Sequence, residues 1–189
     1  MNLLPVQEGE ADLFADVRRR YQRRYRLLFS RDSACLRELR SDMKEYSHRA
    51  LVFWAFGCAQ EALKKLETSC PGDPRPGEAM ALSLQWARGT VRMPQARRAI
   101  LSLHAMAREK DNKADAALCH ALGHACATVH TAKHAIGLPI YELTSLVLDR
   151  GIAGFERLAL DRISAYRGFL RNIGDEVQEG RWAAFLMDK

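Results

Sequence analysis

Apolar side chains recur every three or four residues over most of this chain, which is the spacing of one face of an α-helix. Residues 13–28 show this pattern, and residues 152–170 show it again. Nowhere do apolar and polar residues alternate for long enough to predict a β-strand, and we find no internal repeat. The sequence therefore predicts an all-α fold, a multi-helix bundle of about seven or eight helices.

The length and composition predict one domain. The chain has 189 residues, of which 48% are hydrophobic, enough for one substantial core and rather short for two independent ones. We therefore predict a single helical domain over residues 1–189, with a basic helical arm at 1–43 and further helices at 149–189. Residues 50–59 (ALVFWAFGCA) are apolar on every side, so we expect them at the centre of the core.

Proline and glycine mark the ends of the predicted central helices. Residues 70–77 (CPGDPRPG) hold three of the six prolines and form the clearest break. Asp73 has the position of a helix cap, so a helix should begin there and end before Gly89. Pro94 should open the next helix, which places His104 on its apolar face. A lone histidine on such a face is more often a core residue with satisfied hydrogen bonds than a ligand. Antiparallel packing with the helix that follows would bring His104 towards the histidines of that helix.

Four of the six histidines fall within residues 116–141, which the pattern predicts to be helical as far as Gly137 and Pro139. They form two pairs with i, i+4 spacing, His120 with His124 and His130 with His134. On one continuous helix these side chains share a face. Because histidine is the commonest metal ligand, a zinc site completed by another helix is one hypothesis, with Cys126 as a further candidate ligand. The glutamate of an H-E-x-x-H motif is absent, so we favour structural histidines packed between helices and expect no resident cofactor.

The basic residues raise a second alternative. The formal net charge is +6, and the densest basic cluster comprises Arg18, Arg19, Arg20, Arg23, Arg24 and Arg26. Such a cluster is suited to neutralising the phosphates of nucleic acid. Acidic residues flank it on both sides, which favours a solvated helix face, so we do not expect nucleic acid as the partner.

Several classes of protein are not supported. No apolar run approaches the roughly 18 residues that cross a bilayer, and residues 1–13 lack the pattern of a signal peptide. Five cysteines without a CxxC pair fit reduced thiols that pack as small core residues. We therefore expect a cytoplasmic protein without a membrane partner. No nucleophile elbow, phosphate-binding loop or dinucleotide fingerprint is present, so we do not expect an enzyme.

Four short motifs follow one another in the central part of the chain. They are Asp73, Arg75 and Pro76 in DPRP, Trp86 and Gly89 in QWARG, His104 in LHAMAREK, and Gly123, His124, His130 and His134 in GHACATVHTAKHA. With these motifs, residues 48–141 resemble the Imm-5 like family of immunity proteins of bacterial polymorphic toxin systems. The likeness covers about half of the chain, in the same order and with similar spacing. Residues 1–43 and those after Leu148 match weakly or not at all, and His120 has no firm place in the family pattern.

The resemblance implies an all-helical, non-catalytic protein that neutralises a cognate bacterial toxin by forming a stoichiometric complex with it. Arg75 and Trp86 are candidate contacts, because Arg and Trp are enriched at binding hot spots; helix capping and core packing are the alternative for both. Two other functions stay open. One is a metal-binding module or metal-dependent enzyme that uses His104, His120, His124, His130 and His134. The other is a nucleic-acid or protein interaction module that uses the arginine-rich helix. The sequence does not fix the oligomeric state.

Overall fold

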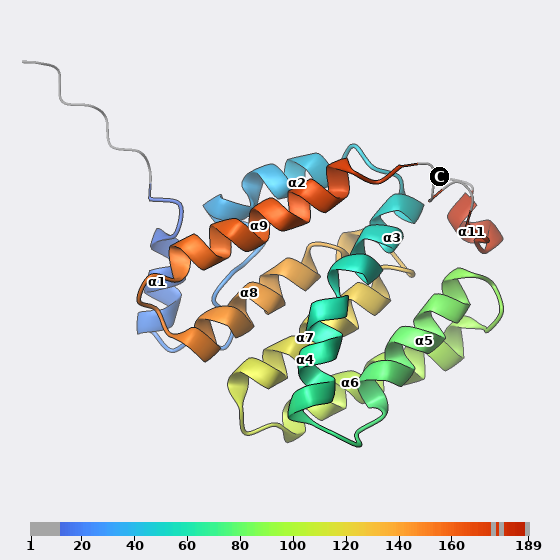
Figure 1. Cartoon of the computed structure of the whole chain (residues 1–189), viewed down its shortest axis with the longest axis horizontal. Coiled ribbons are helices and arrows are strands. Elements are labelled where there is room, and N and C mark those ends of the chain that lie inside the picture. The colour runs from blue at the N-terminus through green and yellow to red at the C-terminus, as the bar shows by residue number, and fades with distance from the viewer. Residues whose placement is uncertain (1–11, 175–176, 178–179, 188–189) are drawn as a thin grey trace, which may run out of the picture.

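The computed structural model describes residues 12–174, 177 and 180–187, and within these residues the only regular elements are helices (Figure 1). The all-α prediction is confirmed. The α-helices are α1 (Ala15–Gln22), α2 (Arg37–Met43), α3 (His48–Cys58), α4 (Gln60–Ser69), α5 (Arg75–Ala87), α6 (Met93–Glu109), α7 (Lys113–Ala127), α8 (Gly137–Arg150), α9 (Phe155–Arg171) and α11 (Ala184–Met187). Two 3-10 turns, η1 (Ala34–Leu36) and η2 (Ala132–His134), connect them.

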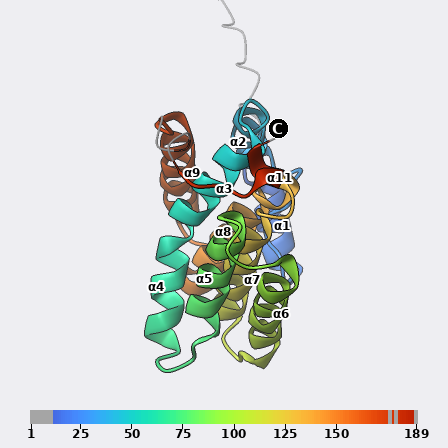
Figure 2. The same cartoon turned by 90° about the vertical axis from the view of Figure 1, so that its right-hand side faces the viewer.

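Helix α7 lies in the middle of the bundle. It packs against α8 and α6, and also against α4 and α5, while α9 covers α8 and α2 on the other side (Figures 1 and 2). Its buried positions include Ala117, Ala121 and Ala125, whose small side chains let neighbouring helices approach closely. Most of the buried apolar side chains form one continuous cluster that reaches from Phe14 to Leu186.

Helix α3 carries the apolar segment that the sequence placed at the centre of the core, and this prediction is confirmed. Trp54 is completely buried, and its indole N–H donates a hydrogen bond of 3.0 Å to the carbonyl oxygen of Tyr166 in α9. Close to it, a Cβ atom added at Gly57 would lie 2.2 Å from the ring of Phe169. The glycine therefore lets α3 and α9 pack in direct contact.

The first helix is shorter than the predicted segment 13–28, because α1 ends at Gln22. The N–H of Arg24 donates to the carbonyl oxygen of Tyr21, and the N–H of Tyr25 donates to that of Arg20. These two bonds form a Schellman cap, in which Arg24 has a left-handed backbone with φ of 56°. Gly89 occupies the equivalent position after α5 with φ of 74°, and there the glycine pays no steric penalty.

Two predicted boundaries around α5 and α6 are close to the observed ones. Pro94 lies in the first turn of α6, as predicted. Asp73 lies just before α5, and its carboxylate accepts the backbone N–H of Arg75 at 3.1 Å. The predicted helix 177–187 lies partly outside the described residues; within them, residues 180–183 are not helical and only α11 follows. None of the described helices combines the length and the apolar character needed to cross a membrane.

Candidate functional site

The prediction that the four histidines share a face of one continuous helix is wrong, because α7 ends at Ala127. The hydroxyl of Thr128 donates to the carbonyl oxygen of His124 at 3.0 Å, and Thr131 then has an extended backbone with φ of −155°. Threonine has a low helix propensity, and its hydroxyl competes for backbone hydrogen bonds. The chain therefore turns between the two predicted histidine pairs.

We predicted that Gly137 and Pro139 end a helix. This prediction is wrong, because both residues lie in the first turn of α8. A proline in the first helical turn costs little, since the N–H that it lacks has no partner within the helix there. Helix α8 then runs back along α7. This reversal places His134 and Tyr141 beside the histidines of α7.

Four histidines from three elements meet in what we call the histidine cluster: His104 of α6, His120 and His124 of α7, and His134 of η2. The Nδ1 atoms of His104 and His120 are 2.9 Å apart, and those of His124 and His134 are 3.2 Å apart. The rings of His104 and His124 lie 6.1 Å apart and connect the two pairs. The ring of Tyr141 lies 5.1 Å from those of both His120 and His124. The predicted approach of His104 to the following helix is confirmed.

Two glycines provide the space for these rings. A Cβ atom at Gly123 would lie 2.6 Å from Cε1 of His104, and one at Gly137 would lie 2.4 Å from Nδ1 of His124. Both distances are shorter than any normal van der Waals contact. The Gly-His pair of the GHACATVHTAKHA motif is thus part of one steric arrangement, in which glycines on α7 and α8 make room for imidazoles on neighbouring elements.

The cluster favours neutral imidazoles. Burial lowers the pKa of His104 to about 4 and that of His124 to about 3, with smaller contributions from the other histidines. Burial also lowers the pKa values of His120 and His134. Each Nδ1 pair therefore consists of one N–H donor and one acceptor nitrogen at neutral pH. Two hydrogen-bonded neutral pairs satisfy the ring nitrogens that face one another between these four half-buried side chains.

The remaining members of the predicted metal set are not part of this cluster. Cys126 is completely buried, its sulfur lies 3.7 Å from that of Met80, and burial raises the pKa of its thiol to about 12. His130 is exposed, and its ring stacks on that of Trp86. Cys126, His130 and His134 do not lie along one continuous helix, because α7 ends at Ala127. Throughout the described part of the chain, no three His, Cys, Asp or Glu side chains have an arrangement suited to a metal ion.

The DPRP motif ties the start of α5 to the end of α6. The guanidinium of Arg75 makes hydrogen bonds to the carboxylate of Asp73, the shortest 2.7 Å, and another of 2.7 Å to Glu109. The hydrogen bond from Arg75 lowers the pKa values of both carboxylates. Pro76 is buried in the first turn of α5. Arg75 therefore has a structural role as an ion-pair bridge.

The QWARG motif also serves packing. Trp86 is only 7% exposed, and its ring lies against those of His130 and Phe185. Gly89 forms the helix cap already described. The carbonyl oxygen of Ala87 accepts a hydrogen bond of 2.8 Å from the N–H of Ala183, which anchors the segment before α11.

A buried ionic network was not predicted from the sequence. Glu142 is 5% exposed, and its carboxylate lies 2.7 Å from the guanidinium of Arg162 and accepts a hydrogen bond of 2.7 Å from the hydroxyl of Tyr166. Glu61 pairs with the same guanidinium at 3.0 Å. The sequence signal that could have predicted this network is a glutamate at an apolar position of a helix. Such a glutamate is buried, and a buried carboxylate needs a cationic partner. The network joins α8 to α9 and α4.

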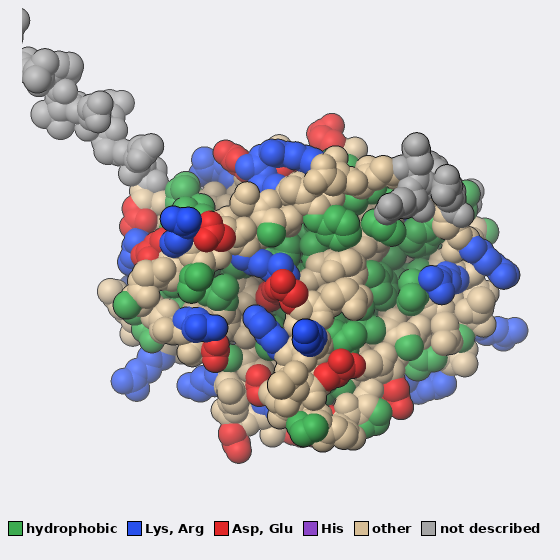
Figure 3. All heavy atoms as spheres, in the orientation of Figure 1, with side chains coloured by type: hydrophobic (Ala, Val, Ile, Leu, Met, Phe, Trp, Pro, Cys, Tyr) green, Lys and Arg blue, Asp and Glu red, His purple; other side chains and the backbone are tan. Residues whose placement is uncertain are grey.

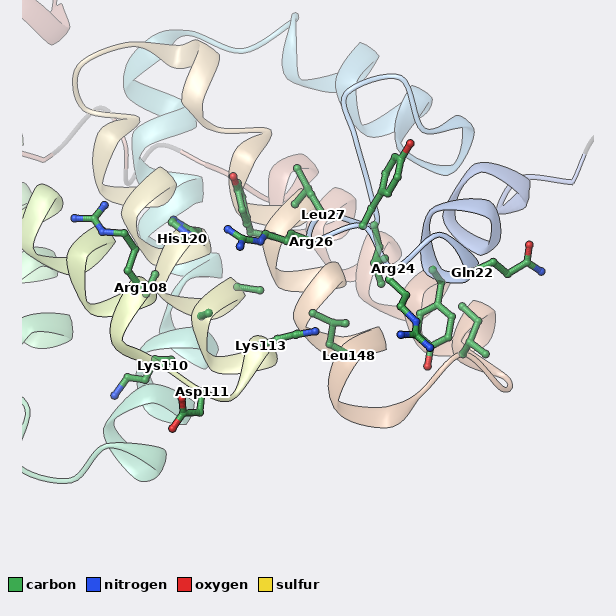
Figure 4. A pocket seen from close by; sticks show the side chains of 18 of the residues that line it. Gln22, Arg24, Arg26, Leu27, Arg108, Lys110, Asp111, Lys113, His120 and Leu148 are labelled. Atoms are coloured by element: carbon green, nitrogen blue, oxygen red, sulfur yellow. The ribbon is translucent and has the colours of Figure 1, made fainter.

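One wall of the histidine cluster faces a large groove. The groove has a volume of about 1370 Å³ and lies between α1 with its following loop and the adjoining parts of α6, α7 and α8 (Figure 4). His120 and Tyr141 form part of its lining. We call it the basic groove, because six of its lining side chains are cationic: Arg18, Arg24, Arg26, Arg108, Lys110 and Lys113. By contrast, the face in Figure 3 shows basic and acidic side chains interspersed, and no histidine is visible there.

Comparison with known proteins gives one family. The family model described as "Imm-5 like putative immunity protein" matches residues 41–168, which is more than half of the chain. The match extends the likeness beyond the central motifs to the end of α2 and most of α9. No curated protein and no solved structure matches the chain.

Proposed function

The chain belongs to the Imm-5 like family of immunity proteins, and on this premise we propose that it neutralises a cognate bacterial toxin by stoichiometric binding. The family match over residues 41–168 is the observation that carries the proposal. Neutralisation by binding requires a stable surface that is complementary to the toxin, and requires no turnover.

The properties of the titratable side chains support a non-catalytic mode of action. Burial raises the pKa values of Cys35, Cys119 and Cys126 to about 12 and that of Cys58 still further, so these thiols are poor nucleophiles. In the histidine cluster, each Nδ1 atom is occupied by another histidine. We further propose that the protein acts in the cytoplasm, which its five free cysteines support.

The family motifs contribute to this function by maintaining the scaffold, as we infer from their contacts. Arg75 bridges two helices, Trp86 is buried against two rings, and Gly123 makes room for His104. None of these contacts needs a partner. Substitutions at these positions should therefore reduce stability first, and protection only through that loss.

Co-expression tests the proposal. A candidate toxin, chosen from a toxin-like gene adjacent to this one where such a gene exists, is expressed in a sensitive bacterium, with this protein or with an empty vector. The proposal predicts that growth is restored, and that the protein co-purifies with a catalytically inactive toxin variant in a 1:1 ratio. Toxicity that persists despite soluble, folded protein would contradict the proposal for that toxin.

A further inference from the structure

We propose that the basic groove binds an acidic amphipathic helix. That the helix belongs to the toxin rests on the proposed function. The chemistry of the helix is inferred independently, from the size, charge and lining of the groove.

The volume of the groove suits a segment of polypeptide. At about 1370 Å³ it exceeds the roughly 300–1,000 Å³ of typical small-molecule sites. An α-helix has a diameter of about 10–12 Å and rises about 1.5 Å per residue, so such a space holds roughly ten residues, or nearly three turns. Helices that bind in grooves use about this length to present their anchoring side chains.

The charge of the groove selects an acidic ligand. Six lining side chains are cationic, and Asp111 is the single acidic side chain among the described lining residues. Arg18 already pairs with Asp12 and Glu156, but four of the other cations have no ion-pair partner within the described residues: Arg24, Arg26, Arg108 and Lys113. Figure 4 shows these four around the groove, two on the loop after α1 and two around the turn between α6 and α7. Acidic side chains of a partner would complete these pairs and would also accelerate association.

The aliphatic lining favours a peptide over a nucleic acid. Four half-buried aliphatic side chains line the groove between the cations: Leu27, Ala116, Leu148 and Ile152. An amphipathic helix buries its apolar face against such side chains while its acidic face meets the cationic rim. A nucleic-acid strand gains most from stacking its bases on free aromatic faces. Of the tyrosines that line the groove, Tyr141 packs against two histidine rings, and Tyr25 lies 5.7 Å from the guanidinium of Arg20.

The loop after α1 has a left-handed residue, Arg24, where two cationic side chains reach the groove. Arg24 has the left-handed conformation that glycine usually supplies at a Schellman cap and that a side chain makes sterically unfavourable. This turn directs the chain so that Arg24, Tyr25 and Arg26 all line the groove, and Tyr25 remains 48% exposed. Arg and Tyr are among the side chains enriched at binding hot spots, and residues in unfavourable backbone conformations are common at functional sites.

A matched pair of double variants tests the inference. The groove variant carries Arg26→Glu and Arg108→Glu; the control variant carries Arg97→Glu and Arg98→Glu, which have the same change of charge at exposed positions of α6 outside the groove. All four side chains are exposed, so both variants should fold, and circular dichroism checks this. The probes are a fluorescent helical peptide with Leu on one face and Glu on the other, the same peptide with Lys in place of Glu, and a single-stranded oligonucleotide.

Fluorescence anisotropy at low salt should show that the Glu peptide binds the wild-type protein and that the Lys peptide does not. The groove variant should bind the Glu peptide at least tenfold more weakly, and the control variant within about twofold of wild type. Equal binding to both variants, or no binding to wild type, would overturn the inference. It would also be overturned if the oligonucleotide bound more tightly than the Glu peptide and lost its affinity in the groove variant.

The two proposals fail separately. If wild-type protein restores growth against the toxin and the groove variant restores it equally well, the assignment of the groove is wrong and the immunity function stands. If wild-type protein does not restore growth, the immunity proposal fails for that toxin, while the peptide measurements still decide whether the groove binds acidic helices.

Discussion

Replacing Gly123 by alanine should destabilise the protein, although alanine is the better helix former. Gly123 lies inside α7, where a change from glycine to alanine normally stabilises by about 1 kcal/mol. Here the new methyl group would lie 2.6 Å from the ring of His104. That ring is held by His120 through a hydrogen bond of 2.9 Å and packs against His124, so it has little room to move away.

The magnitude follows from two opposing contributions. Overpacking of a well-filled site costs about 1–3 kcal/mol, and the helix-propensity gain offsets about 1 kcal/mol of that. The net loss for Gly123→Ala should therefore be up to about 2 kcal/mol. In a His104→Ala background the clash is absent, and the same substitution should stabilise by about 1 kcal/mol. The coupling energy of the double-mutant cycle should thus be about 1–3 kcal/mol, which is the clash itself.

Urea unfolding of the four proteins, followed by circular dichroism, measures this coupling. Gly168→Ala provides the control, because Gly168 lies in α9 with nothing within 4 Å of an added Cβ atom. It should stabilise the protein equally in both backgrounds. If Gly123→Ala has the same effect with and without His104, the steric account of the histidine cluster is refuted.

Three further predictions concern the polar groups. Acidification should lower the free energy of unfolding between pH 6.5 and about 4, because the pKa values of the histidine cluster are depressed in the folded state and the unfolded chain therefore binds more protons. Urea unfolding across this range should show that the free energy of unfolding depends less on pH in His104→Gln than in wild type. Glu142→Gln should cost about 3 kcal/mol, measured in the same way, because it leaves Arg162 largely buried without its main counterion, whereas Glu61→Gln at the exposed end should cost much less. Arg75→Ala should lower stability by about 1 kcal/mol, and Arg75→Lys should recover only part, since lysine cannot reproduce the forked hydrogen bonds to Asp73; equal stability of the lysine variant and wild type would contradict this.

The elements that could be predicted from the sequence are those with strong local signals. Proline at position 94 and glycine at position 89 marked helix ends correctly, because their backbone preferences act whatever the surroundings. The apolar segment around Trp54 was correctly placed in the core for a similar reason. The approach of His104 to α7 followed from the antiparallel packing of consecutive helices.

The elements that could not be predicted depend on tertiary contacts. Thr128 and Thr131 end α7 and begin η2 without any glycine or proline, a weak signal that a helical pattern easily hides. Gly137 had the appearance of a helix breaker, yet it is required where it lies because His124 occupies the space of its missing side chain. The groove lies between segments that are far apart in the sequence. The arginines at positions 18–26 therefore did not predict that Lys110 and Lys113 would line the same groove.

Titration of toxin activity tests the central claim most directly. Increasing amounts of this protein are added to a fixed concentration of active toxin, well above the dissociation constant, and the residual activity is measured. Stoichiometric binding predicts a linear decrease that ends at one equivalent. Complete loss of activity at a small fraction of an equivalent would indicate catalytic inactivation, and undiminished activity at several equivalents would show that the protein does not bind and block that toxin.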